Sequence, residues 1–515
     1  MRIIKTETMQ PDSLNRNDGL WAYNGLDCCI TLEVFEALRG ELTPVTEATY
    51  SFSKSLQGPI LEMNSRGIRV DIQRRDEVLA SYRMDTLRLT EYLNDLIREG
   101  IGWEFTISKN RKYSWPSDDQ LKDLFYKQMG LPPIYKRNAA GERVLTVERD
   151  ALEKIEMYYY AGPVVRFILA LRDLQKKMAF LSTSVDLDGR LRTSFNIAGT
   201  TTGRLASSYS DFGTGTNLQN VENRLRSVFI ADPGFKFCNV DLEQGDSRGV
   251  GAIHWNLFRD SRYLDACESG DLHTSVARAA FRHLPWTGDL AADRSIANGS
   301  FYRSFSFRDA AKRLGHGSNY QGQADKMSRA THIPIQDVVL FQQEYLKSFP
   351  AFPMWWKWVQ EQLRDVRKLT TLMGRQRYFF GQWKDSDTLR AAIAYEPQSI
   401  TADTIDRGLL ALWRANRVQL LLQVHDSVLF QFPEEQEDEI VPWALDTLRQ
   451  PLMLRGNRPF VIPGEAKTGW NWSDSKDDPD ALRKYTGNDS RKRVRGDHVE
   501  QYHATAIAEE DPVMG

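Results

Sequence analysis

The chain has 515 residues, of which 41% are hydrophobic and 26% charged, and its formal net charge is -2. This length allows a large core and two to four domains or subdomains, and the balanced charge excludes a uniformly basic protein, so any affinity for nucleic acid must come from a local cleft. The sequence contains no run of about 18 apolar residues, so it supports neither secretion nor membrane insertion. The four cysteines lack a CxxC pair, which favours a reducing, cytoplasmic setting.

Helical patterns dominate the first part of the chain. From about Ile72 to Asp188, apolar and charged residues recur with the helical period, as in Arg75–Leu89. Basic and aromatic side chains that could contact phosphates cluster within this region, although a surface loop is the simpler interpretation: Lys109, Arg111, Lys112, Tyr113 and Trp115.

A buried strand is predicted at Lys236–Val240, because this run is apolar and rich in residues that favour strands. The strand would deliver Asp241 at its exposed end. A single aspartate at a strand end is more often a turn residue than a catalytic one, so Asp241 gains weight only with a partner.

A helix with a cationic face is predicted next. Four residues recur at every fourth position and therefore share one face: Arg308, Lys312, His316 and Tyr320. Arg and Lys one turn apart match the β- and γ-phosphates of a triphosphate, and Lys312 is also placed to protonate departing pyrophosphate. A solvated basic face is the ordinary alternative. Gly315 and Gly317 argue against it, because each costs an exposed helix about 1 kcal/mol and suits a close approach of a base or backbone.

The partner of Asp241 comes from a predicted hairpin. Leu420–Phe432 consists of two apolar runs around a polar centre, and its tight turn would present Asp426. Carboxylates on two neighbouring strands can hold two Mg²⁺ ions about 3.5–4 Å apart, one activating a hydroxyl and the other clamping a triphosphate. Two further segments are simpler: Trp355–Trp358 is expected in the core of a helical region, and the composition from about Ser473 predicts a largely disordered, charged tail.

Together these segments resemble the family A DNA polymerases, the bacterial polymerase I group and its phage relatives. The likeness runs from about Gly58 to Trp472. It rests on motifs in the family's order: Gly58–Asp71, Thr201–Ser207, Asn217–Asn220, Asp241–Arg248, Asp271–Thr274, Arg308–Tyr320, Thr371–Arg377, Arg390–Gln398 and Val424–Ser427. The resemblance implies an α+β fold, that of a right-hand polymerase with an antiparallel palm sheet, helical fingers and a helical thumb. It also implies template-directed DNA synthesis from a primer 3′-hydroxyl.

The resemblance also assigns roles to single residues. It implies that Asp241 and Asp426 hold two Mg²⁺ ions, with Mn²⁺ as a substitute, and that Lys312 joins them in catalysis. The nucleotide-binding residues would be Arg308, Lys312, His316, Tyr320, Asp246, Gln244 and His273. The DNA-binding residues would be Arg204, Asn217, Gln219, Asn220, Arg248, Arg390, Gln398 and His425. The minor-groove readers among them suit an enzyme that must accept every sequence, because minor-groove acceptors are nearly sequence-independent.

The implied domains follow in chain order. They are an exonuclease remnant at 1–45, the start of the polymerase region and thumb at 46–190, the first part of the palm at 191–249, the fingers at 250–389, the second part of the palm at 390–472 and the tail at 473–515. Tyr23–Asp27 resembles the last motif of a 3′–5′ exonuclease, but the 22 residues before it contain no Asp-x-Glu. We therefore expect a helix that packs beneath the polymerase and no proofreading, in a phage or mobile element whose protein works in the host cytoplasm.

Several positions depart from the family pattern, so sugar selection and fidelity stay open. Asp246 stands where Glu is usual, His316 where Phe or Tyr is usual, and Ser427 where Glu is usual; Ala394 and Gly245 are also smaller than the usual residues.

Two other functions are considered. One is a single-subunit RNA polymerase, which often has Ser after the His-Asp pair, and the other is a non-catalytic DNA-binding scaffold. The expected partners are primer–template DNA and deoxynucleoside triphosphates. A separate exonuclease, helicase or processivity factor stays open, and no membrane partner is expected.

Overall fold

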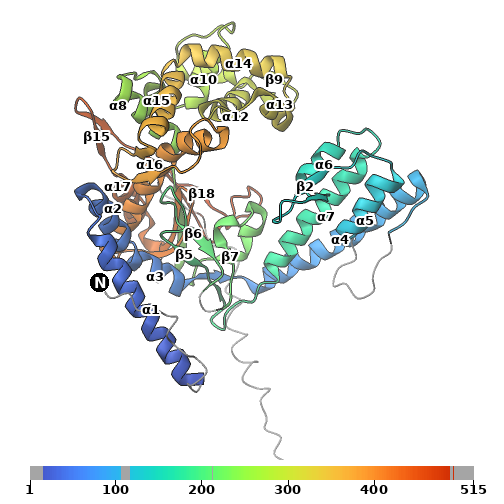
Figure 1. The fold of residues 1–515 in the computed structure, drawn as a ribbon, viewed down its shortest axis with the longest axis horizontal. Coiled ribbons are helices and arrows are strands. Elements are labelled where there is room, and N and C mark those ends of the chain that lie inside the picture. The colour runs from blue at the N-terminus through green and yellow to red at the C-terminus, as the bar shows by residue number, and fades with distance from the viewer. Residues whose placement is uncertain (1–15, 106–115, 211–212, 488–490, 492–515) are drawn as a thin grey trace, which may run out of the picture. The chain divides into compact units, whose positions relative to one another are not determined.

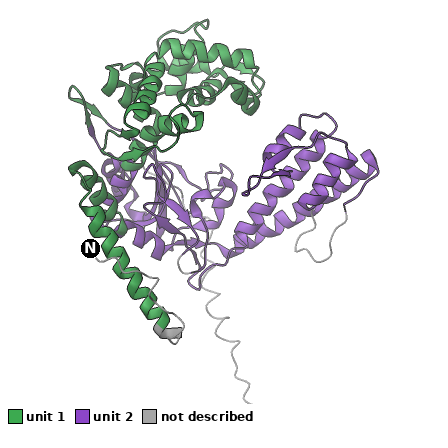
Figure 2. Cartoon of the chain, in the orientation of Figure 1, with its two compact units in different colours: residues 1–57, 244–403, 453–460 green, residues 58–243, 404–452, 461–515 purple. Residues whose placement is uncertain are grey.

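The structure is a computed structural model that describes residues 16–105, 116–210, 213–487 and Arg491. The chain divides into two compact units, shown in different colours in Figure 2. Unit 1 comprises residues 1–57, 244–403 and 453–460, and unit 2 comprises residues 58–243, 404–452 and 461–515. Each unit is therefore assembled from segments that are far apart in the sequence.

A five-stranded antiparallel sheet with the strand order β13-β14-β8-β17-β18 forms part of unit 2. Its central strand β8 (Phe235–Leu242) pairs on one side with β14 (Ser427–Pro433) and on the other with β17 (Gly464–Gly469). Strands β13 (Gln419–Val424) and β18 (Arg483–Lys484) lie at the edges. The strand predicted at Lys236–Val240 and the hairpin predicted at Leu420–Phe432 are both confirmed, because the aromatic and branched side chains of both segments pack in the core.

A helical lobe forms another part of unit 2. The long helices α4 (Ile72–Ile101) and α7 (Gly162–Leu181) lie side by side in it (Figure 1). Asp71 caps the start of α4 by accepting a hydrogen bond from the Arg74 amide, and Gly102 ends the helix with a positive φ of 68°. The helical pattern predicted from Ile72 is thus confirmed.

The remaining elements of unit 2 are short. They are α3 (Gln57–Arg66), β1 (Ile68–Val70), α5 (Asp118–Lys122), η3 (Asp123–Gln128), β2 (Tyr135–Arg137), β3 (Arg143–Leu145), α6 (Arg149–Ile155), β4 (Arg190–Leu191), β5 (Ser194–Asn196), β6 (Ala206–Ser208), η4 (Leu218–Asn220), η5 (Asn223–Val228), β7 (Phe229–Ile230), η6 (Glu434–Gln436) and α17 (Glu437–Leu448).

Unit 1 is mainly helical. Its core is aromatic and includes Tyr263, Tyr345, Phe352 and Trp355, all at most 3% exposed. The elements are α1 (Arg16–Arg39), α2 (Pro44–Ser55), α8 (Gly245–Phe258), α9 (Arg262–Glu268), α10 (Leu272–Ala280), α11 (Leu290–Ala297), β9 (Ser300–Tyr302), β10 (Phe305–Ser306), α12 (Phe307–Asn319), α13 (Ala324–Thr331), α14 (Ile335–Ser348), α15 (Ala351–Asp365), β11 (Lys368–Thr370), β12 (Gln376–Tyr378), β15 (Leu452–Leu454) and β16 (Arg458–Phe460). The unit boundary falls inside α16 (Ser386–Ala415).

The tryptophans of α15 are buried to different degrees. The prediction that Trp355–Trp358 is core is confirmed for Trp355, whereas Trp356 and Trp358 are half-buried.

The N-terminal helix differs from its prediction. Residues 16–39 do form helix α1, but none of its described side chains, at positions 19–39, is buried. Trp21 and Tyr23 are 75% and 65% exposed. The expected packing of this helix is therefore wrong for the side chains that the structure describes.

The tail also differs from its prediction in part. Residues 473–487 are ordered, because β18 pairs with β17 and the backbone carbonyl of Asp480 accepts hydrogen bonds from the amides of Trp470 and Asn471. The side chain of Arg491 donates to the carbonyls of Ala481 and Thr468. The remaining residues of the Arg491–Arg495 run lie outside the described residues. The predicted basic and aromatic cluster at Lys109–Trp115 also lies outside them.

Within the described ranges, no helix has both the length and the apolar character needed to cross a membrane.

Candidate active site

The two aspartates predicted to act together lie on neighbouring strands of unit 2. Asp241 is near the end of β8, and Ser427, the first residue of β14, is its partner in the register. Asp426 precedes Ser427 in a two-residue turn in which His425 has a φ of +57°. The Leu242 amide donates a hydrogen bond of 3.0 Å to the Asp426 carbonyl, which fixes the turn against β8. The hairpin therefore brings Asp426 next to the end of β8 that carries Asp241.

The environment of Asp241 suits a cation. Burial and the neighbouring Asp426 raise the pKa of Asp241 to about 7. The side chain lies at a recess of about 370 Å³ that Glu243, Glu465 and Lys467 also line. Two oxygen ligands that repel each other without a cation are a donor set that fits Mg²⁺.

The described residues contain no group of three or more His, Cys, Asp or Glu side chains that could hold a metal ion. Mg²⁺ in sites of this chemistry is commonly bound by one or two carboxylates, with substrate phosphates and water completing the shell. The number of carboxylates in the aspartate pair is thus compatible with such a site.

The cationic helix is confirmed as α12 of unit 1. Ser306 and Asp309 form a capping box that starts the helix, since each side chain accepts a hydrogen bond from the other's backbone amide. Lys312 and His316 are exposed, whereas Arg308 and Tyr320 are half-buried on the same face. The rings of His316 and Tyr320 are 5.4 Å apart in an edge-to-face contact.

The two glycines of α12 have a role within the protein that the sequence did not indicate. A Cβ at Gly315 would lie 3.3 Å from Cγ1 of Val276, and a Cβ at Gly317 would lie 3.1 Å from Sδ of Met327. Both glycines thus make room for protein side chains. The close approach of a base or backbone at these glycines stays a prediction.

Arg308 is held by a buried carboxylate. Its Nε and Nη2 each donate a 3.0 Å hydrogen bond to Asp271, which is 3% exposed. Burial of Asp271 opposes its ionisation, but hydrogen bonds from Arg308 and Thr274 outweigh that effect and lower its pKa. Burial, Arg308 and Lys312 lower the pKa of His273 to about 4, so His273 is neutral at pH 7. These groups form one basic cluster within unit 1.

Asp246 and Gly245 both contact Thr401, which sequence reasoning missed. The Thr401 hydroxyl donates a 2.8 Å hydrogen bond to Oδ1 of Asp246. A Cβ at Gly245 would lie 2.6 Å from Cγ2 of Thr401, so the small residue is required by the threonine methyl group. Gln244, which precedes them, has a φ of +56° at the start of α8. No signal in the sequence links Thr401 to these positions, because 155 residues separate it from Asp246.

The predicted DNA-binding residues fall into two groups. Arg204 is half-buried in the structure, Asn220 and His425 are exposed, and Arg390 forms an ion pair with Asp387. By contrast, the Gln219 amide group donates to the carbonyls of Leu205 and Gln423 and is only 9% exposed.

Three other predicted DNA-binding residues also have a hydrogen-bond partner within the protein or are at least half-buried. The Asn217 side chain caps η4 by accepting from the Gln219 amide. Arg248 is buried and Gln398 half-buried. Gln219 and Asn217 therefore hold neighbouring segments of the protein together. The sequence predicted contacts with the minor groove for these residues and did not predict this structural role.

The predicted site residues are divided between the two units. Unit 2 contains Asp241, Asp426, Arg204, Asn217, Gln219, Asn220 and His425. Unit 1 contains Arg308, Lys312, His316, Tyr320, Asp246, Gln244, His273, Arg248, Arg390 and Gln398.

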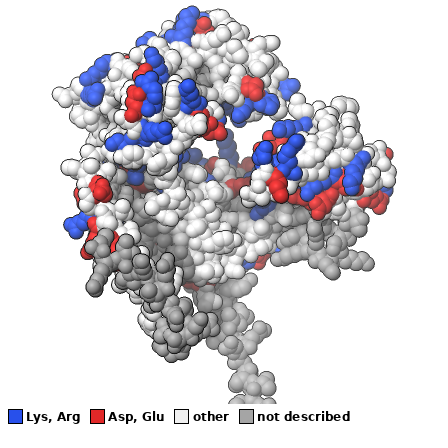
Figure 3. All heavy atoms as spheres, in the orientation of Figure 1, with Lys and Arg blue, Asp and Glu red and all other residues white. Residues whose placement is uncertain are grey.

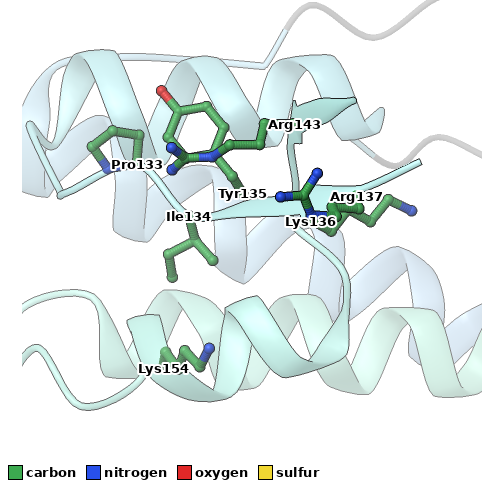
Figure 4. Close-up of a pocket in the computed structure, with 7 residues that line it drawn as sticks. All are labelled: Pro133, Ile134, Tyr135, Lys136, Arg137, Arg143 and Lys154. Carbon is green, nitrogen blue, oxygen red and sulfur yellow. The ribbon is translucent and has the colours of Figure 1, made fainter. Parts of the chain in front are cut away.

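A basic pocket in the helical lobe of unit 2 was also missed. It lies at the β2–β3 hairpin and has a volume of about 550 Å³. Its lining residues, shown in Figure 4, are Pro133, Ile134, Tyr135, Lys136, Arg137, Arg143 and Lys154. The Arg143 guanidinium lies 4.7 Å from the centre of the Tyr135 ring. In Figure 3 the lobe carries both basic and acidic side chains, so its positive charge is local. The basic residues on both sides of the Asn138–Gly141 turn are the signal that could have revealed it.

Most of the chain is similar to known DNA polymerases. The sequence model of DNA polymerase family A matches residues 88–474. The chain is 26% identical to the thermostable DNA polymerase I of Thermus thermophilus over 449 residues, which is 83% of this chain and 48% of that protein. It is 27% identical to DNA polymerase I of Treponema pallidum, covering 80% of this chain and 39% of that protein. The chain thus spans about half or less of the length of these curated relatives.

A solved structure has a similar fold. The POL domain of Pol1 from M. smegmatis, in complex with DNA primer-template and dNTP, superposes with a TM-score of 0.62 at 23% sequence identity. The match covers 81% of this chain and 69% of that one. The match to the family model covers most of the chain and includes both aspartates of the pair. The chain therefore belongs to DNA polymerase family A.

Proposed function

We propose that the chain is a DNA-directed DNA polymerase that adds deoxynucleotides to a primer 3′-hydroxyl. The observation that carries the proposal is the pairing of β8 with β14, which brings Asp241 and Asp426 to the same end of these two strands. The curated relatives are named DNA polymerase I, and the similar solved domain was captured with primer-template and dNTP. The β-sheet would serve as the palm, the helices of unit 1 as the fingers and the helical lobe as the thumb.

The chain's own residues would divide the reaction between them. Asp241 and Asp426 would hold two Mg²⁺ ions, which when bound supply a positive charge that lowers the pKa of the primer hydroxyl and stabilises the leaving group. Arg308 and Lys312 would bind the triphosphate, and Lys312 would donate a proton to the departing pyrophosphate. His273 is neutral at pH 7, so it would donate a hydrogen bond to a phosphate oxygen without adding charge.

Sugar recognition would involve Asp246 and His316. Because the Thr401 hydroxyl holds Oδ1 of Asp246, the short carboxylate is drawn toward α16. His316 presents a ring that can donate or accept a hydrogen bond, beside Tyr320. Both features support a sugar pocket that differs from that of relatives with Glu and an apolar ring at these positions.

A primer-extension assay in Mg²⁺ tests the proposal. The full chain is incubated with a labelled primer–template and either deoxynucleotides or ribonucleotides. A DNA polymerase extends with deoxynucleotides, an RNA polymerase prefers ribonucleotides, and a DNA-binding scaffold shifts the primer–template in a gel without extending it. Extension that is faster with ribonucleotides, or binding without extension, would refute the proposed activity.

A further inference from the structure

The carboxylate of Asp271 is rigidly placed. Asp271 precedes α10 and caps it, because Oδ1 accepts from the Thr274 amide at 3.2 Å and Oδ2 accepts from the Thr274 hydroxyl at 3.0 Å. The residue is 3% exposed. A buried carboxylate fixed by its own helix is a firm anchor for cationic side chains.

Two arginines from different helices share this anchor. Arg308 of α12 binds both carboxylate oxygens, and Nε of Arg294, from α11, lies 3.2 Å from Oδ2. Nε of Arg308 lies 3.0 Å from that same oxygen. The two guanidinium groups are therefore close neighbours. The side chain of Arg294 is 58% exposed, against 24% for Arg308.

The cluster carries more positive than negative charge. One carboxylate serves two arginines, and the side chain of Lys312, one turn beyond Arg308, makes no hydrogen bond or ion pair within the described part of the chain. Within the same residues, the ion pair with Asp271 is the sole polar contact of the Arg294 side chain, which leaves its two terminal nitrogens available. Guanidinium nitrogens arranged in this way match the oxygens of a polyphosphate.

Arg294 is not needed to fasten α11. Asp289 caps that helix by accepting a 2.8 Å hydrogen bond from the Ala292 amide. Asp293, fully buried, accepts hydrogen bonds from the amides of Thr287 and Gly288, and its Oδ2 lies 3.2 Å from Nε of Arg278. The link between α10 and α11 therefore already exists, and Arg294 is free to act on a ligand.

We propose that Arg294 is an additional phosphate-binding residue, which binds the triphosphate of the incoming nucleotide beside Arg308 while Asp271 orients both guanidinium groups. The proposal rests on the proposed function for the identity of the ligand. The phosphate chemistry itself can be tested without DNA synthesis.

Isothermal titration of the full chain with inorganic tripolyphosphate, without metal ions, tests the binding step. Arg294→Ala should weaken binding at least fivefold. Arg278→Ala is the matched control, because Arg278 also pairs with a buried aspartate of this helix pair but does not contact Asp271, and it should stay within twofold of the wild type. Arg294→Lys, which keeps the charge but loses the fork, should fall between the wild type and Arg294→Ala.

Failure of the inference is distinguishable from failure of the proposed function. Wild-type and Arg294→Ala affinities within twofold of each other, no measurable binding by the wild type, or an equal loss in Arg278→Ala would each overturn the role of Arg294. In primer extension, Arg294→Ala should raise KM for the deoxynucleotide at least fivefold while kcat changes less than twofold. If the wild type does not extend primers at all, the proposed function fails, whereas the tripolyphosphate titration still decides the role of Arg294.

Discussion

At the scale of single residues, the predicted site residues of each unit include acidic groups whose neighbours set their charge. The pKa of Asp241 is raised by burial and by Asp426, whereas the pKa of Asp271 is lowered because hydrogen bonds from Arg308 and Thr274 outweigh burial. A carboxylate next to another carboxylate favours a cation, and one that already accepts from arginine anchors that arginine. Aspartate side chains thus have two different roles in this protein, since Asp241 favours a cation and Asp271 anchors an arginine.

The metal-binding role proposed for the aspartate pair leads to the first prediction. Asp241→Asn or Asp426→Asn should reduce primer extension at least about a thousandfold, because a lost ligand removes about 4 kcal/mol or more of transition-state stabilisation. Primer–template affinity should change little, since most of it comes from phosphate contacts. Glu439→Gln, an exposed change in α17, is the control. Near wild-type extension by either aspartate variant would refute the assignment.

The second prediction concerns sugar selection at Asp246. Asp246→Glu lengthens the side chain by about 1.5 Å, so that it can reach beneath the ribose and exclude a 2′-hydroxyl. The ratio of kcat/KM for deoxynucleotide over ribonucleotide should rise about tenfold, which corresponds to about 1.4 kcal/mol. Asp325→Glu, on the exposed surface of α13, should leave the ratio unchanged. A ratio within twofold of the wild type for Asp246→Glu would mean that the pocket is compensated elsewhere.

At the scale of elements, the basic pocket at β2–β3 predicts that the helical lobe binds DNA in a salt-dependent way. The double variant Arg137→Ala/Lys154→Ala removes two cations from the pocket at β2–β3. If each contacts one phosphate, the plot of log affinity against log salt should become shallower by about 2, because each contact contributes about 0.9 to the slope.

A second double variant controls for charge alone. Lys122→Ala/Lys127→Ala removes two cations from the same lobe, but both of these lysines are paired with aspartates. Its salt slope should match that of the wild type. Equal slopes for all three proteins would exclude the pocket at β2–β3 from DNA binding.

A buried histidine in α8 predicts how stability depends on pH. His254 is 0% exposed and packs edge-to-face on Phe352, and burial lowers its pKa to about 3. Between about pH 6.5 and pH 3 the unfolded chain therefore binds a proton at this position that the folded chain does not. Stability falls as the pH falls through this range, by about 1.4 kcal/mol per unit.

The variant His254→Leu removes this proton. The melting temperature of this variant should fall less between pH 7 and pH 5 than that of the wild type. His283→Leu, at an exposed position, serves as the control and should behave as the wild type does. Parallel pH profiles for His254→Leu and the wild type would contradict the assignment.

At the scale of the whole molecule, the 515 residues are expected to lack 3′–5′ exonuclease activity. Asp27 is exposed on α1, and the described residues contain no group of three or more His, Cys, Asp or Glu side chains that could hold a metal ion. The purified chain should leave 3′-labelled single-stranded DNA intact. Digestion that Asp27→Ala abolishes would show that α1 is catalytic, and digestion that survives this change would reveal a nuclease site elsewhere.

The local parts of the site were predictable from the sequence. The strand at Lys236–Val240, the hairpin that presents Asp426 and the helix that carries Arg308 all follow from hydrophobic periodicity and turn position, and the structure has all three. Their order along the chain also identified the family. These features depend on residues close together in the sequence, where periodicity carries the information.

Contacts between distant segments were decided only by the tertiary structure. Thr401 explains Gly245 and holds Asp246, and Asp271 joins Arg308 to Arg294. Residues 473–487 are ordered because β18 pairs with β17, although their composition predicts disorder. Sequence periodicity reports which side of an element is apolar, whereas the identity of the partner depends on how the elements pack, and for that reason only the folded chain revealed these contacts.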